Sequence, residues 1–306
     1  MRINTKRRLE LSRLISKINR IDPSESFPAI EDSREIGSAF RIGITGPVGA
    51  GKSTLINKLA AEIRAIGLSI GILAVDPSSP FTGGAVLGDR IRMSSLISDE
   101  GVFIRSLATR GAFGGLAECT VDASDLLDAF GFDRIIIETV GVGQTEVDIV
   151  EACDVTIVIL EPSSGDSVQA IKAGLMEIAD LFVINKMDVK GSSIYISDLE
   201  MVLGLKGIDH QIPVIPVQAT SGMGIEKLAL AIEDFYKSSS ESGRLLSRRQ
   251  KQRTKRIRKV VENVIMKRLW KGVDSEMIKE AASSTLPIRE AAREVVNKIS
   301  VEKGKQ

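Results

Sequence analysis

Short apolar runs rich in β-branched residues recur through the central part of the chain and alternate with stretches of helical spacing. The runs lie at residues 40–45, 69–76, 102–106, 134–139, 155–160, 181–185 and 213–217. They are apolar throughout rather than at every second position, which is typical of strands covered on both faces. The pattern predicts an α/β fold with a mainly parallel sheet flanked by helices. In such a sheet, functional residues are expected just beyond the carboxyl ends of the strands.

Helical patterns predict extensions at both ends of the chain. Near the start, Leu11, Leu14, Ile15 and Ile18 have helical spacing, and Asp22-Pro23 ends the pattern. The serine-rich run 238–243 reads as a linker, and Leu286-Pro287 predicts a break between later helices. Between them, a second apolar stripe follows helical spacing at Ile257, Val260, Val261, Val264, Ile265 and Leu269, and Trp270 at its end is expected to be a packing anchor.

Composition places the chain among globular proteins. Of the 306 residues, 43% are hydrophobic and 26% are charged, and no apolar run approaches the roughly 18 residues needed to span a bilayer. The first residues lack the apolar core of a signal peptide, so we expect a cytoplasmic protein. Cys119 and Cys153 are too few for a disulfide framework and are not spaced as thiolate metal ligands, which predicts two small buried side chains.

Charge is distributed unevenly although the formal net charge is +1. Residues 1–20 carry seven Lys/Arg and one Glu, and residues 244–268 carry eleven Lys/Arg and one Glu. The centre of the chain is therefore acidic. Such asymmetry indicates nucleic acid, a membrane or a complementary protein surface, including a second copy of the chain, as a partner of the basic ends. For 244–268, the plain alternative is a helix whose charges stay solvated.

The first predicted strand is followed by a glycine-rich loop and a helical pattern. Gly46-Pro47-Val48-Gly49-Ala50-Gly51-Lys52-Ser53-Thr54 has the spacing of a phosphate-binding P-loop. Glycines let backbone N–H groups turn towards a phosphate chain, and the following helix N-terminus adds a favourable dipole. Lys52 is expected to reach the β- and γ-phosphates, and Ser53 to offer its hydroxyl to Mg²⁺.

A second candidate segment follows the strand at 134–139. Glu138 stands where P-loop enzymes place a carboxylate that holds Mg²⁺ directly or through water. Gly141 can present its backbone N–H to the γ-phosphate because it has no Cβ. A pattern as short as Glu138 to Gly141 often occurs by chance, but its position at the end of a predicted buried strand favours a role in nucleotide binding.

Asn185-Lys186-Met187-Asp188 follows the strand at 181–185 and predicts which base is bound. A carboxylate at Asp188 can accept hydrogen bonds from N1–H and the 2-amino group of guanine, whereas adenine would leave that charge unpaired. Asn185 would brace the loop and the base N7, the stem of Lys186 would cover the ring, and the Ala219 N–H would meet the guanine O6. We therefore expect GTP rather than ATP.

These motifs resemble the MeaB/ArgK/MMAA family of SIMIBI-class P-loop GTPases, which chaperone adenosylcobalamin-dependent methylmalonyl-CoA mutase and its relatives. The likeness is carried by residues 74–93, by Thr109-Arg110-Gly111 and by residues 138–150, and it extends loosely into the basic C-terminal helix. It implies a division into an N-terminal helical extension (1–38), a P-loop GTPase domain (39–237) and a C-terminal helical dimerisation region (238–306). Some members carry an older label as kinases of an arginine/ornithine transport system, which these motifs do not require.

The resemblance also implies roles for charged residues. Asp76, Asp89 and Glu138 would be Mg²⁺-site carboxylates, and Arg92 would lie near the phosphates. Asp166 and Lys172 would lie in a mobile segment, where Lys172 would link nucleotide state to the partner. The plainer alternatives are a surface salt bridge for Asp89 and Arg92, and a solvated helix start for Asp166 and Lys172.

One departure from Ras-like enzymes bears on the rate of hydrolysis. Those enzymes place a water-orienting Gln directly after the glycine of the second switch, whereas Val142 follows Gly141 here and Gln144 comes later. Lys52, Mg²⁺ and the P-loop amides would stabilise the transferred charge, and dimer or partner contacts would complete the positioning of water. We expect unaided turnover below about 1 s⁻¹.

Two other functions compete with a cobalamin-related GTPase. A nucleic-acid- or ribosome-associated GTPase would use the basic run 244–268 as its contact, although no aromatic residue precedes Trp270 there to stack on bases. A nickel-type metallochaperone is disfavoured because His210 and two distant cysteines are the only soft ligands in the chain.

Overall fold

The computed structural model describes residues 4–18, 28, 30, 35–76, 96, 98–108, 118–139, 148–162, 174–205, 212–270 and 273–303. These residues form two compact units, one ending at Arg249 and the other beginning, apart from a short earlier segment, at Gln250. In order, the elements are α1 (Thr5–Ile18), β1 (Phe40–Thr45), α2 (Lys52–Ala65), β2 (Ile70–Asp76), β3 (Val102–Ala108), α4 (Glu118–Ala129), β4 (Arg134–Thr139), η2 (Ile149–Glu151), β5 (Val155–Leu160), α7 (Leu175–Ile178), β6 (Leu181–Ile184), α8 (Ser192–Leu205), β7 (Val214–Pro216), α9 (Ile225–Glu241), α10 (Arg244–Trp270), α11 (Ser275–Ser283) and α12 (Ile288–Lys303).

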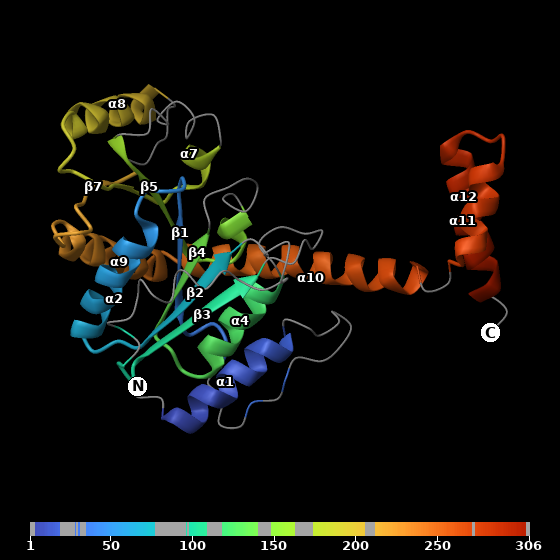
Figure 1. Cartoon of the computed structure of the whole chain (residues 1–306), viewed down its shortest axis with the longest axis horizontal. Coiled ribbons are helices and arrows are strands. Elements are labelled where there is room, and N and C mark those ends of the chain that lie inside the picture. The colour runs from blue at the N-terminus through green and yellow to red at the C-terminus, as the bar shows by residue number, and fades with distance from the viewer. Residues whose placement is uncertain are drawn as a thin grey trace. The chain divides into compact units, whose positions relative to one another are not determined.

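The strands of the first unit form one sheet in the order β3-β2-β4-β1-β5-β6-β7 (Figure 1). Each described pairing between neighbouring strands is parallel. The α/β fold and the parallel sheet expected from the sequence are therefore confirmed. Because β1 lies between β4 and β5, the segments that follow these three strands leave the sheet next to one another.

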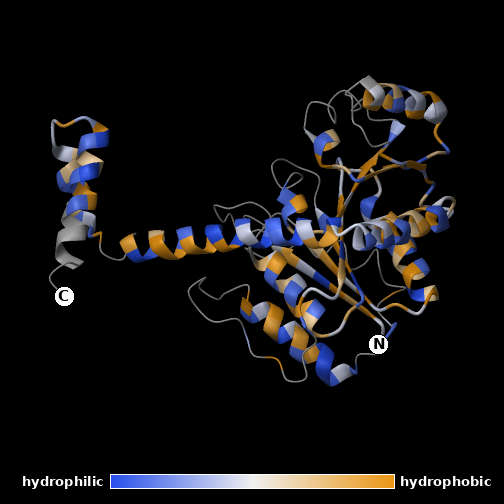
Figure 2. Ribbon diagram, turned by 180° about the vertical axis from the view of Figure 1, so that it is seen from behind, coloured by the Kyte–Doolittle hydropathy of each residue, from blue (hydrophilic) through white to orange (hydrophobic). Residues whose placement is uncertain are grey.

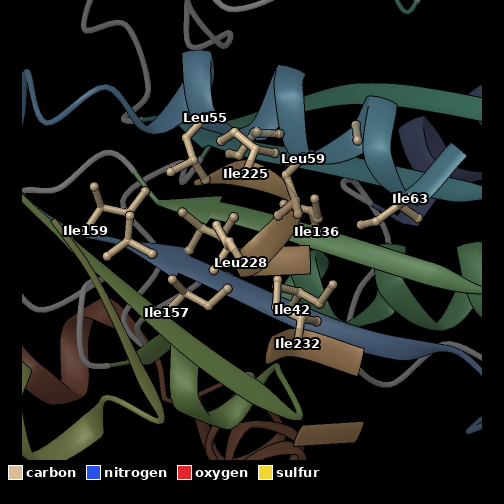
Figure 3. Packing of buried hydrophobic residues seen from close by; sticks show 14 of the residues in the cluster. Ile42, Leu55, Leu59, Ile63, Ile136, Ile157, Ile159, Ile225, Leu228 and Ile232 are labelled. Atoms are coloured by element: carbon tan, nitrogen blue, oxygen red, sulfur yellow. The ribbon is translucent and has the colours of Figure 1, made fainter. Parts of the chain in front are cut away.

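The sheet is covered by helices on both faces, as its continuously apolar strands require. In Figure 3, leucine and isoleucine side chains of α2 and α9 meet those of β1, β4 and β5, and Leu55, Leu228 and Ile157 in this cluster are fully buried. A separate apolar cluster is formed by β5 and β6 with α7 and α8. The N-terminal helix α1 packs against α4. The P-loop helix α2 is thus fixed by the central core.

The serine-rich run 238–243, predicted to be a linker, is helical as far as Glu241. Helix α9 continues to Glu241, and only Ser242 and Gly243 separate it from α10. The serine side chains are accommodated in helix because their hydroxyls donate to carbonyls of the preceding turn, as Ser240 does to Tyr236 O at 2.7 Å. Ser239 is buried, so tertiary packing overrides the local turn preference.

Helix α10 is coloured in alternating hydrophilic and hydrophobic bands, whereas the strands are mostly hydrophobic (Figure 2). Two of its basic residues pair with carboxylates and are not simply solvated charges, in contrast to the plain interpretation of the basic run. Arg248 donates to Asp180 Oδ2 at 2.8 Å, and Arg249 Nε donates to Asp154 Oδ1 at 2.7 Å. Acidic residues of the same chain therefore neutralise the start of this helix.

In the second unit, α11 and α12 pack against each other, and Leu286-Pro287 separates them as predicted. The apolar stripe of α10 is exposed within this chain at Ile257, Val261 and Ile265. Trp270 is 59% exposed, so the packing role expected for it is not fulfilled within the described part of this chain. None of the helices that the structure describes is both long and apolar enough to cross a bilayer.

Candidate functional site

The predicted P-loop connects β1 to α2 and has the backbone that its glycines permit. Gly46, Gly49 and Gly51 have positive φ angles of 141°, 87° and 87°. A Cβ on Gly46 would lie 2.1 Å from the Ile159 carbonyl oxygen of β5, so this loop can leave the sheet only without a side chain there. Val48 and Thr54 are exposed, whereas Ala50 is buried beneath the loop.

Lys52 lies at the first position of α2, and its side chain turns back into the loop. Its ammonium donates to the carbonyl oxygens of Gly46 at 2.8 Å and Pro47 at 2.9 Å. The residue is only 7% exposed. A buried ammonium held by neutral carbonyl oxygens is well suited to exchange them for phosphate oxygens, because charge-assisted hydrogen bonds are stronger.

The structure brings together Ser53 and Glu138, two of the residues expected to hold Mg²⁺. The Ser53 hydroxyl donates to Glu138 Oε1 at 2.8 Å, and both side chains are buried. Glu138 is placed there by β4, which pairs with β1 through Ile44. Hydroxyl and carboxylate oxygens are hard donors, and Mg²⁺ needs only one or two protein carboxylates when phosphate and water complete its shell. These residues therefore fit the ion.

Next to the Ser53–Glu138 pair lie two threonines that the sequence motifs did not predict. Thr139 donates through its hydroxyl to the Thr45 hydroxyl at 2.8 Å, and both residues are buried at the last positions of β4 and β1. The bond joins the strand that enters the P-loop to the strand that precedes Gly141. The sequence does show a threonine at the end of each of these two predicted strands. It does not show that β1 and β4 are neighbours, which is needed to predict the hydrogen bond between Thr139 and Thr45.

The predicted base-recognition loops are joined to the P-loop by Asn185. Its side-chain nitrogen donates to the Ala50 carbonyl oxygen at 2.8 Å, and its oxygen accepts from the Ala219 N–H at 3.0 Å. A Cβ on Gly51 would lie 2.3 Å from the same Asn185 nitrogen. Asn185 thus hydrogen-bonds to both the P-loop and the loop that contains Ala219. A guanine O6 at the Ala219 N–H would share that donor with Asn185.

The other two residues of this motif lie on the surface side of the loop. Asp188 is exposed, and Lys186 is intermediate in exposure. The Lys186 ammonium pairs with the carboxylate of Glu161, a residue that the sequence analysis did not select. Glu161 directly follows β5, so an acidic residue at the end of a predicted strand was the feature of the sequence that could have pointed to it. The contact itself bridges two segments that are far apart in sequence.

Several predicted site residues lie outside the described residues. They are Asp89, Arg92, Gly141, Asp166 and Lys172, and Val142, Gln144 and His210 also lie there. The backbone of Asp76 ends β2, beside β4, but its side chain also lies outside the described part. Among the described residues, no three His, Cys, Asp or Glu side chains form a metal cluster.

Neither Cys119 nor Cys153 forms a disulfide. Cys153 is fully buried as expected, and Cys119 is intermediate in exposure. Burial raises the pKa of the Cys153 thiol to about 12. This thiol is therefore protonated at neutral pH and poorly reactive.

A family model described as "Methylmalonyl Co-A mutase-associated GTPase MeaB" matches residues 21–274. The chain belongs to this family. It is 48% identical to a putative GTPase of Pyrococcus horikoshii over 76% of this chain and 75% of that protein. It is 38% identical to the GTPase ArgK of Escherichia coli, over 78% of this chain and 74% of that one.

Two further matches extend the comparison to a mammal and to a solved structure. The chain is 39% identical to the mitochondrial "methylmalonic aciduria type A homolog" of Mus musculus, over 70% of this chain and 53% of that one. A crystal structure of an "LAO/AO transport system kinase" superposes with a TM-score of 0.66 at 28% identity, covering 97% of this chain and 99% of that one. As a MeaB-family P-loop protein, the chain is a GTPase that binds GTP and GDP.

Proposed function

We propose that this MeaB-family GTPase acts as a chaperone that gates adenosylcobalamin delivery to, or protection of, a methylmalonyl-CoA-type mutase in the cytoplasm. Family membership supports the mutase as partner. The single structural observation that supports the nucleotide site is the bridging of P-loop and base loop by Asn185. This contact supports a site in which one nucleotide spans both segments, because the P-loop and the base loop are hydrogen-bonded to the same side chain.

In this proposal the guanine is recognised by Asn185, Lys186, Asp188 and Ala219. The triphosphate is bound by the P-loop amides from Gly46 to Thr54 and by the N–H of Gly141. On binding, Lys52 transfers its hydrogen bonds from Gly46 and Pro47 to phosphate oxygens and stabilises charge on the transferred group.

The Mg²⁺ site would use Ser53 and Glu138, with Asp76 and Asp89 as further candidate ligands and Arg92 near the phosphates. When bound, Mg²⁺ supplies positive charge that neutralises the β- and γ-phosphates. Ser53 and Glu138 are hydrogen-bonded to each other, so the chain itself holds two of these groups close together. Asp166 and Lys172 are the residues proposed to convey nucleotide state to the mutase.

We also propose that the protein is a homodimer formed through its C-terminal helices. The apolar stripe of α10 supports this, because Ile257, Val261, Ile265 and Trp270 are each about half exposed or more in the single chain. A stripe of this kind on one helix is normally buried by a partner. Sedimentation at several protein concentrations tests the proposal, and a monomer throughout the micromolar range would contradict it.

Two experiments test the proposed function. Calorimetry should show GTP and GDP binding in the presence of Mg²⁺, with ATP bound at least about a hundredfold more weakly, since adenine lacks the N1–H and 2-amino donors that the Asp188 carboxylate is proposed to accept. Pull-down of a cobalamin-dependent mutase should differ between a non-hydrolysable GTP analogue and GDP, and Lys172→Ala should abolish this difference without loss of GTP affinity. Equal capture in both nucleotide states would contradict the gating role.

The competing nucleic-acid function uses the basic run 244–268. The pairing of Arg248 and Arg249 with Asp180 and Asp154 removes two charges from that contact. A gel shift with RNA at moderate salt distinguishes the two functions, because phosphate contacts weaken steeply as salt rises. Tight, salt-sensitive RNA binding without mutase capture would favour the alternative.

A further inference from the structure

Lys186 has an unusual backbone conformation. Among the residues that the structure describes, it is the non-glycine residue with a positive φ, at 60°. A side chain with a Cβ disfavours this left-handed region, and such conformations persist where the surrounding structure enforces them, often at functional sites. The loop is held by backbone bonds on either side, from Asn185 N to Leu160 O at 2.8 Å and from Val189 N to Lys186 O at 3.0 Å.

The Lys186 side chain is also held at its far end. Its ammonium pairs with Glu161 Oε2, while the lysine side chain remains 38% exposed and the glutamate side chain only 9% exposed. A carboxylate so deeply buried requires a positive partner, because an unpaired charge loses its hydration without compensation. The described ion pair supplies that partner.

The sheet fixes Glu161 independently of the base loop. Glu161 directly follows β5, and Leu160 of β5 is in register with Ile184 of β6. The residues after these two strands therefore leave the sheet side by side. Glu161 follows β5, and Lys186 follows the neighbouring strand β6. The carboxylate is a rigid anchor, because it lies at a buried strand end rather than at a loop tip.

An anchored lysine differs from a mobile one as a surface for a nucleotide base. A long lysine side chain loses rotamer freedom when it becomes ordered against a ring. Here the stem is fixed at its backbone by the loop and at its ammonium by Glu161, so base binding carries less of that entropy loss. The Lys186 stem held by Glu161 would cover the face of the guanine ring. Asp188 is proposed to contact the hydrogen-bonding edge of that ring instead.

We propose that Glu161 is a positioning residue for the nucleotide base, which orders the Lys186 stem as the surface that covers one face of the guanine ring. The inference rests on the guanine site proposed above. It assigns Glu161 to affinity for the base and not to hydrolysis, so its loss should raise the Kd of GTP and GDP equally and leave kcat unchanged.

The main test compares nucleotide binding by the full chain and by its Glu161→Gln variant. Calorimetry should show roughly tenfold weaker GTP and GDP binding, the effect of losing one charge-assisted contact. Inosine triphosphate lacks the 2-amino group but keeps the ring, so the ratio of GTP to inosine triphosphate affinity should not change. Binding of inorganic tripolyphosphate should be unaffected. Glu177→Gln, at an exposed position on α7, is the matched control and should bind like the wild type.

A double-mutant cycle tests whether Glu161 acts through Lys186. Lys186→Met keeps an unbranched apolar stem but removes the ammonium, so it should also weaken GTP binding. In this background, Glu161→Gln should change GTP affinity by less than about twofold. A full tenfold effect in both backgrounds would overturn the proposal, as would wild-type GTP affinity of the single Glu161→Gln variant. Weaker tripolyphosphate binding by that variant would also overturn it, by showing a general disturbance of the site.

Asp188→Asn separates failure of this inference from failure of the guanine site. This variant should lower the ratio of GTP to inosine triphosphate affinity, because it alters the edge that contacts N1 and the 2-amino group. An unchanged ratio and unchanged GTP affinity would overturn the guanine site and, with it, the role of Glu161. A lowered ratio together with normal GTP binding by Glu161→Gln would overturn the role of Glu161 alone.

Discussion

The two ends of the parallel sheet hold polar side chains in different ways. At the amino ends, aspartates accept hydrogen bonds from backbone N–H groups where strands begin; they are Asp99, Asp128, Asp133, Asp154 and Asp180. Arginine pairs are formed by Asp99, Asp128, Asp154 and Asp180. At the carboxyl ends, Lys52 is held by carbonyl oxygens and Ser53 by Glu138. The first arrangement satisfies charge permanently, whereas the second can be exchanged for a ligand.

Two of the ion pairs at the amino ends join the acidic centre of the chain to its basic C-terminal region. Asp154 and Asp180 lie just before β5 and β6, and they receive Arg249 and Arg248 from the start of α10. Burial alone would lower the pKa of the Arg248 guanidinium, but Asp180 and neighbouring charges more than offset this and raise it. The amino-terminal end of the sheet is therefore expected to govern stability, and the carboxyl-terminal end to govern nucleotide chemistry.

The largest expected effect follows removal of Asp154. Its carboxylate is buried and accepts from Arg41 N at 2.9 Å and from Arg249 Nε at 2.7 Å. Asp154→Ala should lower the free energy of unfolding by about 3 kcal/mol, because it leaves a partly buried arginine and a backbone N–H without their acceptor. Urea denaturation measures the change.

The folded fraction of Asp154→Ala should bind GTP like the wild type, since the substitution lies at the opposite end of the sheet. Asp198→Ala, an exposed position on α8, is the control and should change stability by less than about 0.5 kcal/mol. If Asp154→Ala changed the free energy of unfolding by less than about 1 kcal/mol, the ion pair of Asp154 would stabilise the fold little more than hydration of the separate charges does.

The next effect concerns the opposite end of the sheet. Lys52→Ala should reduce GTP hydrolysis at least about a hundredfold, equivalent to about 2.7 kcal/mol, because the ammonium stabilises charge on the transferred phosphoryl group. The free energy of unfolding should change far less than in Asp154→Ala. Single-turnover hydrolysis of GTP gives the rate, and Lys58→Ala, exposed on the same helix, serves as control. Activity within tenfold of wild type would refute the assignment.

The sequence was most informative where one interaction dominated. Strands β4 and β5 begin and end at the residues expected, because continuous apolar runs bounded by polar residues leave few other options for burial. The P-loop was found for a related reason, since its glycines and Lys52 are adjacent in sequence. Local patterns thus identified the sheet and the phosphate end of the site.

Contacts between distant segments could not be read from local patterns. The pairs Lys186–Glu161 and Thr139–Thr45 depend on the order of strands in the sheet, which apolar runs do not specify. The helical state of residues 238–241 is accompanied by burial of Ser239, which outweighs the turn preference of serine. In each case tertiary structure, not local propensity, decides.

A smaller effect is expected where α9 meets the start of β4. Arg134 donates to both carboxylate oxygens of Glu233, at 2.9 and 2.6 Å, and its guanidinium lies over the Tyr236 ring at 4.8 Å from the centroid. Glu233→Gln should lower the free energy of unfolding by about 1–2 kcal/mol, because it removes one charge from a mostly buried pair. Asp234→Asn, the exposed neighbour, should have no measurable effect in the same urea titration. Equal stability of the two variants would contradict this account.

The smallest expected effect belongs to Asp99 before β3, and it depends on pH. Hydrogen bonding from Arg64 holds the pKa of the Asp99 carboxyl below its usual value, aided by the Gly101 N–H and opposed by partial burial. A carboxyl with a lowered pKa stabilises the folded state above the unfolded value near 4, and this contribution is lost as pH falls through the folded pKa.

Asp99→Asn should therefore reduce stability by less than about 1 kcal/mol at pH 7, as is usual for partly exposed pairs. The difference from wild type should shrink as the pH falls below about 4, where the wild-type carboxyl also becomes neutral. Thermal unfolding from pH 3 to 7 measures this, with exposed Glu100→Gln as the neighbouring control. A difference that stays constant across this range would mean that the charge of Asp99 is irrelevant and that only its shape holds the turn before β3.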